Sequence, residues 1–372
     1  MSEAAADAAP VDLPGDSHVH SQWSWDALAG SMEGTCQRAV EIGLPAVAFT
    51  EHADFTPWSL GPDLLELVPD DWQPRVIDGV LTPPPLDLDG YLGCLERCRE
   101  RFPGLRILSG VELGEPHWHS ARAAALLRAA GFDRVLASVH SASAGDGFAE
   151  ISDSFRDQDP AQVLRGYLAE TAALITGFDA FDVLAHIDYP VRYWPQDAKA
   201  HDSDDFQEEY RHVLRTLAEA GKALEVNTRV PLHPQVLGWW RQEGGQAITF
   251  ASDAHDPATL AARFTETVLV AQAAGFGAGR DPSGYWGRVL HGLDDRDVGL
   301  ATALAHRDQA APPAGALERV QQRCEQPRAG RAEGMAEGDR AAASRGRRCA
   351  PCAPDLPGRR WPAGSSGCTG PL

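Results

Sequence analysis

The amino-acid sequence predicts an α/β fold in which helices cover a parallel sheet, either closed as a barrel or open and doubly wound. Three observations support this prediction. Short apolar runs alternate with amphipathic helical patterns over residues 15–310, several helical patterns have recognisable ends, and histidines and acids stand where the apolar runs end. The 372 residues are enough for one large domain or two ordinary ones.

Seven apolar runs predict buried strands, because each is short and a helical pattern separates most of them from the next. They cover residues 15–20, 45–50, 105–111, 133–139, 181–187, 223–227 and 246–252. Repeated strand–helix units of this kind pair their strands in parallel and cover the sheet with the intervening helices.

The helical patterns between these runs begin at capping residues or proline and mostly end near glycine. The predicted helices run from Ser31 to Gly43, Gly90 to Phe102, Ser120 to Gly131, Pro160 to Gly177 and Asp204 to Gly221.

Three segments fall outside the alternating pattern. Residues 57–87 hold seven prolines and interrupt a strand–helix unit, which favours a functional loop or lid. Residues 1–14 are acidic and Ala-rich and are predicted to be disordered. Residues 311–372 are rich in Arg, Ala, Gly and Pro, and we interpret them as a disordered or frameshift-derived tail. The predicted domain is therefore residues 15–310.

The formal net charge of −20 disfavours binding of long nucleic acid but permits a small phosphorylated substrate, since metal ions invert the charge within a pocket. We find no apolar stretch of about 18 residues that would span a membrane. The N-terminus lacks the basic and apolar regions of a secretory signal, so a cytoplasmic protein is predicted. The oligomeric state stays open.

Six motifs place histidine, aspartate or glutamate at the ends of predicted strands. His18 and His20 lie two residues apart, as do Asp253 and His255, so each pair points to one face of its strand. The full set of candidate metal ligands is His18, His20, Asp26, His52, Glu112, His140, His186, Asp253 and His255. Nitrogen and oxygen donors without thiolate suit two or three divalent transition metals such as Zn, Mn or Fe.

These motifs resemble those of the PHP family, named for polymerase and histidinol phosphatase domains, over about residues 15–300. The resemblance implies a distorted (β/α)7 TIM-like barrel with its metal site at the C-terminal ends of the strands. It also implies how the ligands divide. One ion would take His18, His20, Glu112 and Asp253, a second would share Glu112 and add His140 and His186, and a third would take Asp26, His52 and His255.

Within that family the chain is most similar to the stand-alone histidinol-phosphatase type. The insertion after His52, the helix 90–102 and the segment Leu224–Arg229 carry this similarity. It implies a phosphatase that hydrolyses L-histidinol phosphate in histidine biosynthesis. The stretch from Glu115 to His119 is unusual, and we interpret its two histidines as lining the pocket mouth or the surface rather than binding metal.

Four residues are candidates for direct roles in the reaction. Arg192 and Arg229 could grip a phosphate through paired hydrogen bonds, and Asp253 or His255 could assist protonation of the leaving oxygen. Three alternatives stay open: a nucleotide phosphatase or nuclease of the same family, an amidohydrolase-like metallohydrolase, and a metal-binding module without turnover. Many amidohydrolase barrels bridge their metals with a carboxylated lysine that follows the fourth strand. This chain has only two lysines, Lys199 and Lys222, and neither follows a predicted strand, which weakens the amidohydrolase alternative.

Overall fold

The computed structural model of the protein describes residues 13–66, 68–279 and 284–289. The predicted tail, residues 311–372, and most of the predicted N-terminal segment lie outside the described residues.

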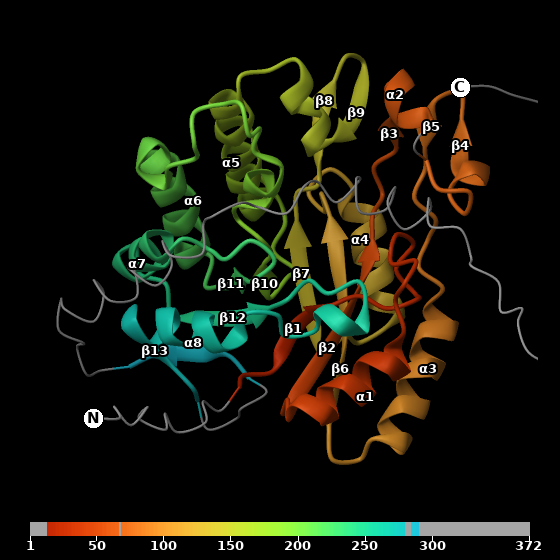
Figure 1. The fold of residues 1–372 in the computed structure, drawn as a ribbon, viewed down its shortest axis with the longest axis vertical. Coiled ribbons are helices and arrows are strands. Elements are labelled where there is room, and N and C mark those ends of the chain that lie inside the picture. Colours follow the sequence, from red (N-terminus) through yellow and green to blue (C-terminus); the bar gives the residue numbers. More distant parts are fainter. Residues whose placement is uncertain (1–12, 67, 280–283, 290–372) are drawn as a thin grey trace, which may run out of the picture. The chain divides into compact units, whose positions relative to one another are not determined.

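Seven parallel strands close into a barrel, as predicted (Figure 1). Around the barrel they follow the order β1-β2-β6-β7-β10-β11-β12, and β12 pairs with β1 to close the ring. Their bounds are Asp16–Val19, Ala46–Ala53, Arg106–Gly114, Arg134–Ser138, Val183–Leu184, Ala223–Asn227 and Ala247–Ala251. The open, doubly wound alternative is therefore wrong.

The closure of the barrel is short. β1 pairs with β12 through Asp16 and Phe250, and a bridge joins Val19 to Ala254 just beyond. The other half of this edge of β12 is taken by β14 (Trp286–Arg288), which runs antiparallel and pairs in turn with β13 (Phe276–Gly277). The pairing with β1 thus holds the barrel closed at the end where the first and last predicted ligand motifs meet.

The covering helices agree with most of the predicted ends. They are α1 (Met32–Ile42), α3 (Leu88–Arg101), α4 (Ser120–Ala129), α5 (Pro160–Gly177), α6 (Gln207–Glu219), α7 (Pro234–Gln242) and α8 (Phe264–Ala273). Ser31 caps α1 through its side chain, and Gly43 ends it with a left-handed φ of 73°.

Two predicted helix starts are wrong. Ser120 is the first residue of α4 rather than its cap, and the capping position belongs to His119. Asp204 lies in a separate 3₁₀ turn, η4 (Ser203–Phe206), before α6 begins at Gln207. The ring of Phe206 stacks on His201 and meets Trp194 edge to face, so tertiary packing sets this turn.

Two small β-structures stand beyond the C-terminal ends of the strands. The Pro-rich insertion contains β3 (Trp58–Ser59), α2 (Pro62–Leu65), η1 (Gln73–Arg75), β4 (Val76–Ile77) and β5 (Val80–Leu81), and its three strands form a sheet. The hairpin of β8 (Ser141–Ala144) and β9 (Gly147–Glu150) follows β7. In Figure 1 both lie toward the end at which the arrows of β6 and β7 point. Trp58 Nε1 donates to Ser141 Oγ at 2.8 Å and so ties the insertion to the hairpin.

Three further 3₁₀ turns complete the described chain: η2 (Ile151–Arg156), η3 (Tyr189–Tyr193) and η5 (Pro257–Thr259). Among the described residues, no helix combines the length and the apolar character needed to cross a membrane.

Candidate metal centre

All nine predicted ligands come together at the C-terminal ends of the barrel strands. Asp26 and His255 have side chains that are 23% exposed, while the other seven residues are buried. The atoms that face one another are imidazole nitrogens and carboxylate oxygens, which are donor types that suit divalent transition metals.

The first group of ligand atoms surrounds one point between β1, β6 and the end of β12. His18 Nε2 lies 2.9 Å from His20 Nε2 and 3.0 Å from Glu112 Oε2. Asp253 Oδ1 lies 3.4 Å from His20 Nε2 and 3.8 Å from His18 Nε2. These are the four side chains that the family resemblance assigns to one ion.

Hydrogen bonds on the far side of each ring decide which nitrogen carries the proton. His18 Nδ1 contacts Glu225 Oε2 at 2.7 Å, and a carboxylate can only accept, so Nδ1 is the donor. Ser24 Oγ donates to Glu51 at 2.6 Å and must therefore accept from His20 Nδ1, 2.9 Å away. In the neutral rings both Nε2 atoms present lone pairs to each other.

Such an arrangement requires positive charge. Two nitrogen lone pairs and two carboxylate groups converge on this point, and the donor set fits a divalent ion. The pKa of His18 also indicates that positive charge is favoured at this point. Burial acts to lower its pKa, but the carboxylates of Glu112, Glu225 and Asp253 raise the pKa well above its ordinary value.

The second group shares Glu112 with the first. Its other oxygen, Oε1, lies 2.9 Å from His186 Nε2 and 3.2 Å from His140 Nε2. His140 Nδ1 contacts Asp54 Oδ1 at 3.2 Å, so its Nε2 carries the lone pair when the ring is neutral. Oε1 of Glu112 thus faces His140 and His186, whereas Oε2 faces His18, His20 and, at 3.2 Å, His52 Nδ1. A carboxylate so placed could hold a cation on each side.

The third group lies nearer to solvent. Asp26 Oδ2 lies 3.2 Å from His255 Nε2 and 3.4 Å from His52 Nε2. Asp26 Oδ1 is buried and has no hydrogen-bond partner in the part of the chain that the structure describes. The His20 ring stacks on His52 with centroids 4.2 Å apart, so this group adjoins the first.

Asp253 joins the cluster to a buried arginine. Its backbone has a φ of 53°, a left-handed value that is costly for a residue with a side chain. Arg192, from η3, reaches Asp253 Oδ2 with Nη1 at 2.6 Å and places its guanidinium over the Tyr189 ring. The Nη2 atom of Arg192 is buried and lacks a hydrogen-bond partner among the described residues.

The other candidates lie farther out. Arg229 is exposed and lies two residues past the end of β11. Burial raises the pKa of Tyr193, and the positive charge of Arg229 acts in the opposite direction on that pKa. His117 Nε2 contacts Glu170 Oε1 at 2.6 Å, and His119 Nε2 contacts Thr56 Oγ1 at 2.9 Å. These two contacts agree with the interpretation of His117 and His119 as residues outside the ligand set.

An aromatic cluster connects the centre to the insertion. Trp25 Nε1 donates to Asp54 Oδ2 at 2.9 Å, and Asp54 in turn holds His140. The Trp25 ring lies 5.6 Å from Trp58 and 4.8 Å from Trp72, both of which belong to the insertion. The insertion is therefore packed against the residue that precedes Asp26.

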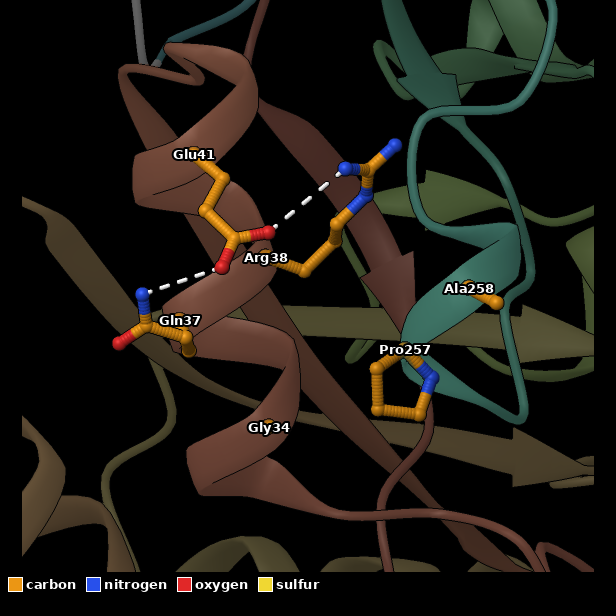
Figure 2. Close-up of a pocket in the computed structure, with 6 residues that line it drawn as sticks. All are labelled: Gly34, Gln37, Arg38, Glu41, Pro257 and Ala258. Atoms are coloured by element: carbon orange, nitrogen blue, oxygen red, sulfur yellow. Dashed lines mark hydrogen bonds and ion pairs between the residues drawn. The ribbon is translucent and has the colours of Figure 1, made fainter.

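A separate surface hollow lies between α1 and η5 (Figure 2). It is lined by Gly34, Gln37, Arg38, Glu41, Pro257 and Ala258. Arg38 and Gln37 both contact Glu41 there, at 3.7 and 3.2 Å. None of the predicted ligands lines this hollow, so it is separate from the metal centre.

Four buried carboxylates that are not among the predicted site residues lie beside the ligands. Glu51, Asp54 and Glu225 accept hydrogen bonds from Ser24, His140 and His18, and Glu115 accepts from the backbone N–H of His140 at 2.6 Å. Asp54 follows His52 by two residues, just past the end of β2, a spacing that could have pointed to it.

Comparison with known proteins gives the following matches. The sequence model described as the PHP domain matches residues 16–229. The histidinol-phosphatase of Lactococcus lactis is 27% identical over 251 residues, which cover 64% of this chain and 83% of that protein. A Thermotoga maritima protein named as a probable histidinol-phosphatase is 24% identical, covering 65% of this chain and 84% of that protein.

A solved structure is similar as well. The Lactococcus lactis histidinol phosphate phosphatase, in complex with zinc, L-histidinol and phosphate, superposes with a TM-score of 0.60 at 25% identity. The match covers 71% of this chain and 94% of that one.

Proposed function

Because this chain belongs to the PHP domain family, we propose that it is a metal-dependent phosphatase that hydrolyses L-histidinol phosphate to L-histidinol and phosphate. The reaction is a step of histidine biosynthesis, and we place the enzyme in the cytoplasm. The substrate assignment draws on the relatives named for this activity and on the complex of one of them with L-histidinol and phosphate.

The convergence of the His18 and His20 lone pairs on Glu112 and Asp253 carries the metal-dependent part of the proposal. We assign the nine clustered side chains as ligands of two or three divalent ions, Zn, Mn or Fe. When bound, close divalent ions supply a site for a phosphoryl oxygen and lower the pKa of water enough for attack at neutral pH.

The side chains around this centre bind and orient the phosphate. Arg192 is held by Asp253 on one side, and its unpartnered Nη2 supports a role as a donor to a phosphate oxygen. Arg229, exposed beyond β11, would meet the same phosphate at the rim of the site.

His255 is a better candidate than Asp253 for the group that protonates the leaving oxygen. Burial acts against ionisation of Asp253, but the charge of Arg192 holds the pKa of that carboxyl well below its ordinary value. Asp253 therefore keeps its charge, which leaves His255, whose side chain is 23% exposed, as the candidate for this role whenever its ring is not bound to the third ion.

Many amidohydrolase barrels bridge their metals with a lysine, and the structure places both lysines of this chain elsewhere. Lys199 pairs with Asp205, and Lys222 donates to the carbonyl oxygen of Asp179. Within the described part of the chain neither side chain contacts the ligand cluster, and the family match points the same way.

The proposal is tested by measuring phosphate release together with bound metal. Purified protein is assayed on L-histidinol phosphate, a mononucleotide, a generic phosphate monoester and a lactone, with the metal content determined in parallel. We expect the highest kcat/KM on L-histidinol phosphate. A higher value on the mononucleotide would move the assignment to a nucleotide phosphatase, and metal-loaded protein without turnover on any substrate would make it a binding module.

Arg192→Lys is expected to lower kcat/KM for the phosphate ester by roughly 10- to 100-fold, because a charge-assisted hydrogen bond contributes about 1.5–3 kcal/mol. Lysine keeps the positive charge beside Asp253, but its compact ammonium lacks the planar fork with which the guanidinium can bind Asp253 and the phosphate through different nitrogens. Steady-state kinetics of both proteins measure the change.

Arg165→Lys is the matched control for this prediction. Arg165 also pairs with an acid, Glu209, and lies over an aromatic ring, Phe206, but it contacts none of the ligands. Equal kinetics of wild type and Arg192→Lys would remove Arg192 from the phosphate site.

A further inference from the structure

Glu225 lies on β11 and is almost completely buried behind the metal ligands. Its two oxygens face different histidines. Oε2 contacts His18 Nδ1 at 2.7 Å, and Oε1 accepts from the backbone N–H of His186 at 3.1 Å. His18 belongs to the first group of ligands and His186 to the second, so one side chain contacts both groups from behind.

The orientation of Glu225 is determined by a chain of donors. Asn227 Oδ1 accepts from the Arg229 N–H at 2.9 Å, which turns the Asn227 amide nitrogen toward Glu225. Asn227 Nδ2 then donates to Glu225 Oε1 at 2.9 Å. Oε1 therefore receives two N–H groups, and only an acceptor atom can occupy that position.

We infer that Glu225 is a positioning residue that keeps the proton of His18 on Nδ1 and so leaves Nε2 free to bind a metal ion. The carboxylate on Oε2 accepts from Nδ1, and a neutral imidazole that donates from one nitrogen presents a lone pair at the other. The inference rests on the proposed role of His18 as a ligand.

Glu225→Gln tests this role without changing the size of the side chain. The two donors at Oε1 admit only the amide oxygen, so the amide nitrogen must take the place of Oε2. It would then donate to His18 Nδ1 and force the proton onto Nε2, the atom that faces His20 and Glu112. We expect the affinity for Zn²⁺ to fall roughly 10- to 100-fold, the usual effect of losing a partner of a ligating histidine.

The measurement is competition for Zn²⁺ between the full-length protein and a chromophoric chelator. Glu170→Gln is the matched control, because it removes the carboxylate partner of His117, a histidine outside the ligand set. We expect unchanged Zn²⁺ affinity in the control. Wild-type affinity in Glu225→Gln would overturn the inference, while a wild-type protein that binds no Zn²⁺ would overturn the proposed function instead.

A second measurement needs no change at Glu225 and so does not depend on the variant folding. In Zn²⁺-loaded wild-type protein labelled with ¹⁵N-histidine, the His18 resonances are assigned by their loss in His18→Gln. We expect a proton on His18 Nδ1 and none on Nε2. A proton on Nε2 would overturn the inference even if the metal affinities agreed with it.

Discussion

Glu112→Gln is expected to remove at least one bound ion and to lower kcat by more than about 100-fold. Loss of a residue that only hydrogen-bonds a metal ligand costs up to about 100-fold, and Glu112 is itself assigned as a ligand. Glu112 is fully buried, and its oxygens face different ligand groups. Oε2 faces His18, whereas Oε1 faces His140 and His186. An amide has only one oxygen, so one of the two groups loses its Glu112 oxygen in either orientation of the glutamine.

The loss of charge acts in the same direction. Five histidine rings contact Glu112, and two divalent ions on either side of a neutral amide would repel each other with less compensation. Metal analysis after gel filtration and phosphate-release kinetics measure the two effects. Glu243→Gln is the control, since Glu243 binds Arg211 and Arg215 on α6. Wild-type metal content and kcat in Glu112→Gln would refute the bridging role.

Asp253→Asn is expected to lower kcat by more than about 100-fold as well, because Asp253 serves two partners at once. One oxygen faces His18 and His20, and the other binds Arg192 at 2.6 Å. Asparagine is a suitable replacement at this position, since Asn tolerates a left-handed backbone and the φ of Asp253 is 53°. The variant therefore changes charge and donor type while leaving the backbone conformation accessible.

The kinetic pattern separates the two functions of Asp253. Loss of an ion appears in the metal content, whereas a displaced Arg192 appears as a raised KM for the phosphate ester. Asp182→Asn is the control, because Asp182 accepts a backbone hydrogen bond from Val135 at the opposite end of the strands. Unchanged kcat in Asp253→Asn would exclude Asp253 from the site.

The strands and the ligand motifs could be predicted because their signals are local. An apolar run followed by a histidine or an acid identifies both the strand and the residue at its C-terminal end, as in β2 with His52 and β7 with His140. Closure into a barrel, in contrast, depends on the pairing of β1 with β12, which the local pattern cannot distinguish from an open sheet.

Two of the carboxylates behind the ligands, Glu225 and Glu115, could not be predicted from local patterns. Glu225 contacts His18 across 207 positions of the chain, and Glu115 contacts His140 across 25. In the sequence each is one acid among 53 acidic residues, and only the folded barrel shows which histidine it faces. The predicted start of α6 at Asp204 is wrong for a similar reason. The packing of Phe206 on His201 and Trp194 is a tertiary effect that overrides the local capping signal.

The contact of Trp25 with Trp58 and Trp72 has a consequence for exchanging parts between related barrels. An insertion transplanted from a relative would bring new side chains against Trp25, whose indole also holds Asp54 and, through it, His140. Grafts that change substrate range should therefore carry the residue at position 25 together with the insertion, as one inherited unit.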